Sequence, residues 1–464
     1  MKIGRTPTLR NTARGTSSFL LLTALATSLL LVMSSCTSND NQPSSSVDQV
    51  LETLNQNAFA GRLIPITSLS ASTSTEDLSF LSSFVSDKSI VALGESTHGT
   101  SEFFTLRHRM IQHMVEKLNF RVLAVETNFS TAQAINAYIT GGSGTALEAV
   151  QNISGWVYNN QEFVQLIEWL RTFNSGRAPA DKVTFYGFDA QSAEAGAKRV
   201  QAYVSSYDPA YMSSFNQTAE PFLNDFQELS AYSYEELERM IPSLVAGYQT
   251  RWNSILTYLN TNKSKLIAQS GDRAYDLMLR HWEIVQQTFN GFVHIADELK
   301  YFNYRDSYMA DNVDWIQKHE NNNKVIIWAH AGHSGKNTGA TGTQMGYNLK
   351  QRHPETFYTI GYFTNGGTVR VVHLSNGVPM LGEATIAPKE EHVLTQAFAK
   401  GQWSQFFLPM SAITGNTALE NLFFRPTKIY FIGADLERST VDQTLGIEYD
   451  AIVFLEKTKA TKAN

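Results

Sequence analysis

A short glycine-bounded stretch of this sequence holds two side chains that can exchange protons. Glu95 and His98 lie within Gly94-Glu-Ser-Thr-His-Gly99, directly after the apolar run Ile90-Val-Ala-Leu. An imidazole titrates near neutral pH, and a neighbouring carboxylate can fix its tautomer. Arg107 follows in a segment whose apolar residues recur at helical spacing. The combination predicts general-base chemistry at a turn between a strand and a helix, such as the activation of water.

Three other apolar runs also end in polar side chains. Glu126 follows Val-Leu-Ala-Val, Asp189 follows Val-Thr-Phe-Tyr-Gly-Phe, and His330 follows Val-Ile-Ile-Trp-Ala, with His333 three positions later. One such run would mean little. Four runs separated by helical stretches predict parallel strands whose carboxyl ends converge on one crevice, where open α/β sheets bind ligands.

The predicted fold class is therefore α/β, with a central, mostly parallel sheet flanked by helices. Between about residues 193 and 317 helical periodicity dominates, which predicts a long helical insertion that forms a possible lid. Its large aromatics, among them Trp252, Trp282 and Phe289, either line a pocket or pack between helices. Later apolar runs predict more strands and a mixed or antiparallel edge to the sheet, at residues 357–363, 369–374, 429–432 and 451–455.

The Gly94–Gly99 motif with Arg107 behind it resembles the erythromycin esterase family. Two further features carry the resemblance, Glu126 at the end of the next strand and Trp328-Ala-His-Ala-Gly-His333 much later. In that family the histidine of the first motif activates water, so the resemblance implies that His98 is the base of a metal-free ester hydrolase without a cofactor. An Asn commonly follows the first histidine of the later motif, whereas this chain has Ala331.

The acidic and basic partners of His98 have alternative roles. Glu126 is expected to orient the base or the attacking water, because a carboxylate among apolar neighbours is costly to bury without a partner. Glu95 is either a second carboxylate or a brace for the loop. Arg107 either pairs with these acids or stabilises the oxyanion that forms as water attacks an ester.

The later motif and its surroundings complete the candidate site. His330 and His333 could protonate the leaving alkoxide or bind the tetrahedral intermediate, and one of them could instead shape the loop. Asp189 is expected mainly to hold neighbouring loops together. Arg305 and Asp306 open a helical segment and are interpreted as structural or as supporting the site from behind.

Several functional classes find no support in the sequence. Lys and Arg number 37 against 43 Asp and Glu, a net charge of −6, and the body has no basic tract for nucleic acid. Gly-x-Ser-x-Gly, Walker and dinucleotide motifs are absent from suitable contexts. Two alternatives to metal-free hydrolysis stay open. Glu95, His98, His330 and His333 could bind zinc in a metal-dependent hydrolase, or the crevice could hold a ligand without turnover.

The N-terminus predicts export and anchoring. Basic residues precede an apolar run that ends at Met33, followed by Ser34-Ser35-Cys36. Cys36 is the only cysteine, and a Cys after small residues resembles a bacterial lipobox. We predict a lipoprotein signal peptide over 1–36, a flexible tether over 37–47 and a folded body over 48–464, lipid-anchored to a membrane of the bacterial cell envelope through Cys36. An ordinary signal peptide with an incidental thiol is the alternative.

The substrate prediction is the broadest one. The resemblance implies a small-molecule carboxylic ester, with a macrolide lactone as the best-known candidate in the family. Many large aromatics in the helical insertion could roof a cleft wide enough for a macrocycle.

Overall fold

A computed structural model of the chain describes residues 46–464 except 154, 227–233, 295–296, 340–341, 376–377 and 437–438. Its centre is a sheet that has eight strands in this described part. Five neighbouring strands run parallel, a sixth strand, β14, continues them in parallel, and β11 and β1 add an antiparallel edge. In spatial order the strands are β1 (Ile64–Pro65), β11 (Gln405–Pro409), β14 (Ala451–Leu455), β8 (Phe357–Thr364), β2 (Ile90–Glu95), β5 (Lys324–His330), β3 (Phe120–Asn128) and β4 (Thr184–Asp189). The predicted fold class, a mostly parallel sheet with a mixed edge, is confirmed.

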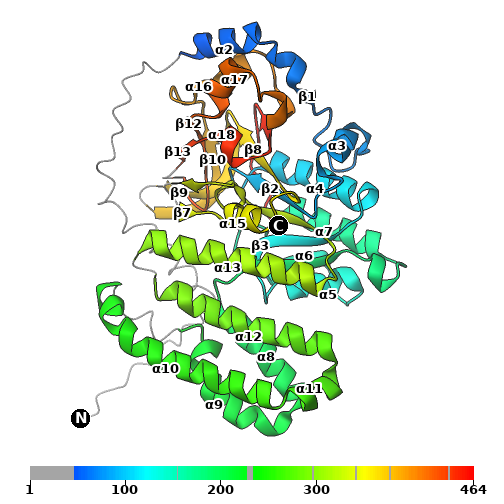
Figure 1. Ribbon diagram of the computed structural model, residues 1–464, viewed down its shortest axis with the longest axis vertical. Coiled ribbons are helices and arrows are strands. Elements are labelled where there is room, and N and C mark those ends of the chain that lie inside the picture. The colour runs from blue at the N-terminus through cyan, green and yellow to red at the C-terminus, as the bar shows by residue number, and fades with distance from the viewer. Residues whose placement is uncertain are drawn as a thin grey trace, which may run out of the picture.

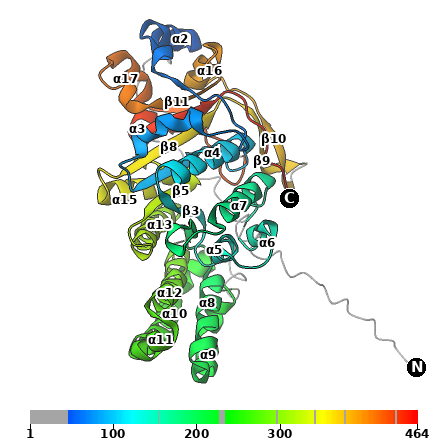
Figure 2. The same ribbon diagram turned by 90° about the vertical axis from the view of Figure 1, so that its right-hand side faces the viewer.

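Helices cover both faces of this sheet, as alternating side chains require. Leu93 of β2 and Trp328 of β5 face one helical layer, whereas Ala92 and Ile327 face the other. Figure 2 shows α4 and α7 on one side of the sheet and α13 and α15 on the other. The first layer contains α4 (Ser101–Lys117), α5 (Gln133–Thr140), α6 (Ala146–Gln151) and α7 (Gln161–Asn174); the second contains α13 (Glu298–His319), α14 (Ala331–Ser334) and α15 (Met345–Arg352).

The segment between β4 and β5 contains helices and, among its described residues, no strand. In Figure 1 its first five helices form the lower part of the molecule, with α13 between them and the sheet. They are α8 (Ala193–Tyr207), α9 (Met212–Leu223), α10 (Tyr234–Thr261), α11 (Lys263–Ser270) and α12 (Asp272–Phe292). Trp252, Trp282 and Phe289 are buried in the hydrophobic core of these helices. Each indole N–H of the two tryptophans donates to the other residue's carbonyl, so these aromatics pack between helices.

Smaller elements complete the body. The predicted strands near residues 369 and 429 form, but outside the central sheet: β9 (Gly367–Ser375) pairs with β10 (Val378–Ile386), and β12 (Thr427–Tyr430) with β13 (Thr440–Gln443). At the end of the sheet farthest from the insertion, α2 (Val47–Gln56), α16 (Val393–Lys400) and α17 (Thr417–Phe423) share a core with β11 and β14. A short helical stretch, Glu76–Leu81 and α3 (Ser82–Val85), precedes β2, and α18 (Leu445–Glu448) precedes β14.

The predictions for the N-terminus lie outside the described residues. The signal peptide, Cys36 and nearly all of the tether fall within residues 1–45. Among the helices that the structure does describe, none is both long enough and apolar enough to cross a bilayer.

Candidate active site

His98 lies just past the carboxyl end of β2 and is bound to Glu95 of the same strand. The His98 Nδ1 is 3.0 Å from Glu95 Oε1, and the other oxygen of Glu95 accepts from Nη1 of Arg107. A carboxylate can only accept, so it holds the proton of a neutral ring on Nδ1 and leaves the lone pair on Nε2. The His98 side chain is 13% exposed, while those of Glu95 and Arg107 are fully buried. His98 is therefore the reachable end of a buried three-residue chain.

Arg107 is held in place from three directions. Its Nε donates to the Phe103 carbonyl one turn earlier in α4, and its guanidinium carbon lies 3.8 Å from the ring centroid of Trp328. Nη2 has no hydrogen-bond partner. Planar stacking on an aromatic ring together with an ion pair suits arginine rather than lysine. The arrangement favours the first of the two expected roles of Arg107, pairing with an acid.

Two glycines let the His98 loop pack against its neighbours. A Cβ on Gly94 would lie 1.9 Å from Ser334 Oγ, and a Cβ on Gly99 would lie 1.8 Å from the Arg370 carbonyl oxygen. The second obstacle is backbone, which cannot rotate away. The glycines that bound the motif thus serve close approach, so the strand end and the loop can pack tightly around His98.

Glu126 forms a second cluster, at the end of β3. Its Oε1 accepts from Arg305 Nη2 at 2.9 Å, and its Oε2 accepts from the His330 backbone N–H at 2.7 Å. Arg305 also donates to both oxygens of Asp189, at 3.1 and 2.8 Å. The guanidinium is thus a fixed cation between two strand-end carboxylates, and these charges raise its pKa well above the usual value despite burial.

His333 joins this cluster through both ring nitrogens. Nδ1 lies 2.9 Å from Asp306 Oδ1, while Nε2 lies 2.9 Å from Arg305 Nη1 and 3.3 Å from Glu126 Oε1. Burial opposes protonation, but Asp306 and Glu126 outweigh burial and the Arg305 charge, so the pKa of His333 is raised. Burial likewise works against ionisation of Glu126, yet the surrounding positive charges and the His330 N–H hold its pKa well below the usual range. The two shifts have opposite signs, as expected for a carboxylate and an imidazole that each favour the charged form of the other.

His330 connects the two clusters. Its ring centroid is 4.8 Å from that of His98, at an angle of 53°, and its backbone N–H binds Glu126. The Nδ1 accepts from Gly332 N–H at 3.1 Å, which places the proton of the neutral ring on Nε2. Burial, reinforced by His98, lowers the pKa of His330 well below its usual value. A neutral ring with an N–H that has no well-formed hydrogen bond thus lies beside His98.

All six residues expected to form the site come together, in two groups joined by His330. Glu95, His98 and Arg107 form one group, and Glu126 and His333 belong to the other. Sequence reasoning gave Arg305, Asp189 and Asp306 supporting roles. In the structure Arg305 contacts Glu126 directly and Asp306 contacts His333, while Asp189 is bound to Arg305. Glu126 makes no hydrogen bond to His98. The sequence signals for these residues were the position of Asp189 at the end of a strand and the adjacent Arg305 and Asp306 in the last helix before β5.

The donor set bears on the zinc alternative. Within the described residues, no group of three or more His, Asp, Glu or Cys side chains is arranged to hold a metal ion. Arg305 occupies the space among the carboxylates of the second cluster, and His333 Nδ1 is bound to Asp306. The positive charge next to Glu126 therefore comes from the chain itself.

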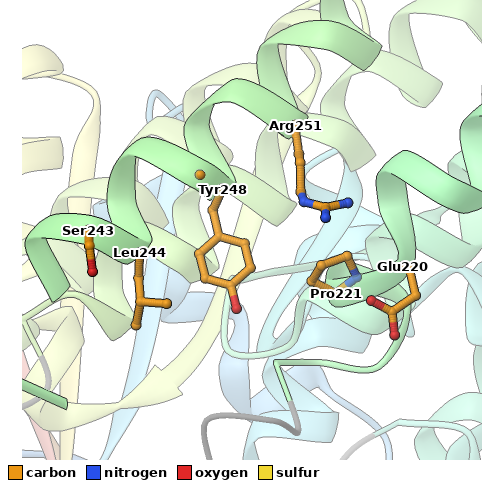
Figure 3. A pocket seen from close by; sticks show the side chains of 7 residues that line it. Glu220, Pro221, Ser243, Leu244, Tyr248 and Arg251 are labelled. Atoms are coloured by element: carbon orange, nitrogen blue, oxygen red, sulfur yellow. The ribbon is translucent and has the colours of Figure 1, made fainter. Parts of the chain in front are cut away.

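A pocket of about 400 Å³ lies elsewhere, between α9 and α10. Figure 3 shows Tyr248 in the middle of its lining, with Arg251 and Glu220 at one end. α12 and α13 separate these helices from the sheet (Figure 1). The pocket lining contains none of the residues of the two clusters.

The fold agrees with comparisons to known proteins. The family model of erythromycin esterase matches residues 115–458, well over half of the chain. The chain therefore belongs to the erythromycin esterase family, a family of hydrolases. The matched residues include Glu126, Arg305, His330 and His333, and begin after His98.

Relatives and solved structures extend this likeness. An erythromycin esterase type II of Escherichia coli is 26% identical over 277 residues, 56% of this chain and 63% of that protein. The crystal structure of a Bacillus cereus protein superposes with a TM-score of 0.76 at 22% identity, covering 90% of this chain and all of the other. A mutant of the erythromycin esterase EreC in its open conformation gives 0.62 at 17% identity, over 85% of this chain and 97% of EreC. These structures share the fold.

Proposed function

We propose that this protein hydrolyses a carboxylic ester or a macrolide-type lactone, with His98 as the base that activates water. The observation that carries the proposal is the bond between His98 Nδ1 and Glu95, which leaves the Nε2 lone pair on a partly exposed ring. General bases need a reachable lone pair on a group that titrates near the working pH. Membership of a hydrolase family supports the same reaction class.

The proposed reaction has two steps. A water molecule gives a proton to His98 Nε2 while its oxygen attacks the ester carbonyl, so the carbon–oxygen double bond becomes a tetrahedral oxyanion. When the intermediate collapses, the bond to the leaving oxygen breaks, and the imidazolium of His98 returns the proton to the alkoxide. The products are a carboxylic acid and an alcohol, and His98 ends in its starting state.

The neighbouring groups have separate parts in this proposal. Glu95, held by its ion pair with Arg107, stabilises the imidazolium of His98 during the reaction. Neutral His330 packs against His98 and helps to fix the position of its ring. Glu126 holds the His330 backbone through its N–H, and Arg305 and His333 hold Glu126.

A panel of esters and lactones tests the proposal. Wild-type protein and the His98→Ala variant are incubated with aryl and alkyl esters and with erythromycin, and ring opening is followed by mass spectrometry. Turnover by wild type that His98→Ala lacks supports the mechanism. Turnover of another ester without erythromycin cleavage removes the macrolide from the proposal. Binding measured by calorimetry without any turnover would favour a ligand-binding protein instead.

The proposal of a macrolide as substrate is supported by the names of relatives and not by the structure of the helical insertion. Two relatives from E. coli are named erythromycin esterases, of types I and II. Trp252 and Trp282, which the sequence suggested could roof a cleft, pack between α10 and α12 instead. An ester of different shape is therefore an equal test substrate.

Chelation separates metal-free from metal-dependent hydrolysis. A bound zinc would supply the nucleophile by lowering the pKa of its water to about 7. Under our proposal, activity survives EDTA treatment followed by dialysis, and metal analysis of the active protein finds less than one equivalent. Loss of activity with EDTA and its return on adding one metal would favour the zinc alternative.

We also propose that the mature protein is anchored through acyl groups on Cys36. The support is the sequence pattern, a basic start, an apolar run and a lone Cys after small residues. Two or more acyl chains give stable anchoring, where one gives only marginal binding. Replacing Cys36 with Ala should release the protein from the membrane fraction, and unchanged retention would contradict the proposal.

A further inference from the structure

The last residues of the chain cross directly over the loop that carries His98. The backbone N–H of Ser101 donates to the Lys459 carbonyl at 2.8 Å, and the N–H of Thr461 donates to the Gly99 carbonyl at 2.9 Å. Thr100 and Ala460 form an antiparallel β-bridge between them. The loop residues that follow His98 thus pair with a segment more than 350 positions away in the sequence.

Other segments hold the same loop from its remaining sides. The Gly99 carbonyl also accepts from Arg370 N–H of β9 at 3.0 Å, and the His98 N–H donates to Ile432 at 3.3 Å. Since these bonds use backbone groups, they fix the path of the loop rather than the identity of its side chains. We define the C-terminal segment as residues 457–464. Its Thr458 also pairs with Gly367 at the start of β9 in a parallel β-bridge.

Glu162, at the second position of α7, joins this segment to the loop. Its carboxylate accepts from Ser101 Oγ at 2.6 Å and from the Lys462 backbone N–H at 3.2 and 3.3 Å. Glu162 is 6% exposed, and a buried carboxylate is costly unless hydrogen bonds replace its water. One side chain therefore connects the start of α4, the start of α7 and the C-terminal segment.

We call the contacts of Glu162 with Ser101 and Lys462 the joint. Further backbone hydrogen bonds hold the segments on either side of it. Asn160 pairs with Ala463 in a second β-bridge, and Gln161 N–H donates to the Lys462 carbonyl at 2.9 Å. Lys459 N–H donates to Glu102 Oε2 at 2.7 Å, again in the first turn of α4. A displacement of the C-terminal segment would therefore also displace the loop, because both are attached to the first turn of α4.

We propose that Glu162 is a positioning residue for the reaction: through Ser101 and the C-terminal segment it fixes the loop at residues 96–101 and with it the place of His98 against Glu95. This role rests on the proposed function of His98 as the base. A base displaced by about 1 Å can lose about 100-fold in rate without losing its chemistry.

A matched pair of variants tests the proposal. Glu162→Ala removes the joint, whereas Glu168→Ala removes an exposed glutamate of the same helix, whose carboxylate accepts from Tyr138. We expect Glu162→Ala to lower kcat by about 10- to 100-fold with KM within about twofold, and Glu168→Ala to change neither. Hydrogen–deuterium exchange of residues 96–104 should accelerate in Glu162→Ala alone. Circular dichroism verifies that each variant is folded at the assay temperature.

Two milder changes keep the test decisive if Glu162→Ala folds poorly. Ser101→Ala removes one hydrogen bond to Glu162, and a chain ending at Thr458 removes the segment that Glu162 holds. Both should accelerate exchange at residues 96–104 and lower kcat, Ser101→Ala less strongly.

The exchange measurement separates this proposal from the proposed function. Unchanged exchange at residues 96–104 in these variants would overturn the positioning role, whatever the activity. Faster exchange with normal kcat would overturn it as well, since the loop would then be free to move without cost. If exchange is faster in the variants but the wild-type protein cleaves no ester, the structural role of Glu162 is supported and the hydrolytic role of His98 is contradicted.

Discussion

His98 and His333 are both bound to a carboxylate through Nδ1, but the rest of their surroundings differ. Glu95, the partner of His98, forms an ion pair with Arg107, and the hydrogen bond to Glu95 leaves Nε2 of His98 available to accept a proton. His333 faces Asp306 on one side and Glu126 on the other, and its pKa is raised. The first arrangement suits a base that accepts a proton from water, and the second favours the protonated form of His333 more than the free side chain would.

Replacing His98 with Ala should remove most of the activity. General-base catalysis contributes about 10²–10⁴-fold, so a loss of that order in kcat is expected without a change in fold. Steady-state kinetics on any ester that wild type cleaves, with circular dichroism beside it, measures both. The matched control is His373→Ala, which replaces a half-buried histidine of β9. Near-normal turnover by His98→Ala would rule out the mechanism.

Glu126→Gln should act through its neighbours. The neutral amide cannot favour the charged form of His333, so the pKa of His333 should fall toward the ordinary value of 6.5. Arg305 retains its ion pair with Asp189. The His330 N–H loses a charged acceptor, and we expect kcat to fall by about 10-fold or more. NMR titration of the His333 ring measures the first effect. A His333 pKa that stays raised would show that Asp306 alone controls it.

At this scale the sequence located the histidines and glutamates but undervalued Arg305. Glu95, Glu126 and His330 could be found because each ends an apolar run, a pattern that local sequence displays. Arg305 lies within a helix and contacts Glu126 and Asp189, which are 179 and 116 positions away. No local pattern records such contacts, since they depend on how α13 packs across the sheet.

Among the elements, the contact between β2 and α4 depends on one ion pair. Glu95 ends the strand and Arg107 lies inside the helix, and both are fully buried. Removing one partner of such a pair leaves an uncompensated charge, which typically costs about 3–5 kcal/mol. Loss of either partner alone is therefore expected to destabilise the packing of the strand end against the helix.

Arg107→Met tests this coupling because methionine keeps the stem that packs on Trp328. We expect the free energy of unfolding, measured with urea, to fall by about 3–5 kcal/mol. The double variant Glu95→Gln with Arg107→Met should be more stable than the single one, since no buried charge remains unpaired. Equal losses in both variants would mean that the ion pair is not the source.

The elements themselves were predictable to different degrees. Strands β2, β3, β4 and β5 are short apolar runs with polar ends, and all four form where the sequence places them. β11 was missed because Gln405-Phe-Phe-Leu-Pro is short and ends in proline. β9 and β12 were found, but their partners β10 and β13 are neighbours in sequence, and a strand pattern does not say with which sheet it pairs.

For the whole molecule, buried neutral histidines should make stability depend on pH. Burial lowers the pKa of His108 to about 4 and that of His281 to about 3, from 6.5 in the unfolded chain. Below pH 6.5 the unfolded chain binds protons that the folded protein does not, so this stability is full above pH 6.5 and falls as the pH drops toward 4. Each histidine contributes a slope of about 1.4 kcal/mol per pH unit.

His108→Leu is the variant that checks this slope, because neither ring nitrogen of His108 has a hydrogen-bond partner to lose. Between pH 6.5 and 4.5 its unfolding free energy should vary by about 1.4 kcal/mol per pH unit less than that of wild type. Urea unfolding at several pH values gives the slopes. Glu126 does not interfere, since its lowered pKa matters only below about 4.5. Identical slopes would show that His108 protonates in the folded state.

The position of β14 has a consequence for how the molecule is made. This strand is among the last segments of the chain, yet it lies inside the sheet between β8 and β11. Until it is synthesised, β8 presents an open edge to other molecules, and β11 and β1 have no strand to carry them. A chain interrupted before residue 451 should therefore aggregate rather than accumulate as a folded, partly active fragment, and newly made molecules are exposed to aggregation until β14 has been synthesised.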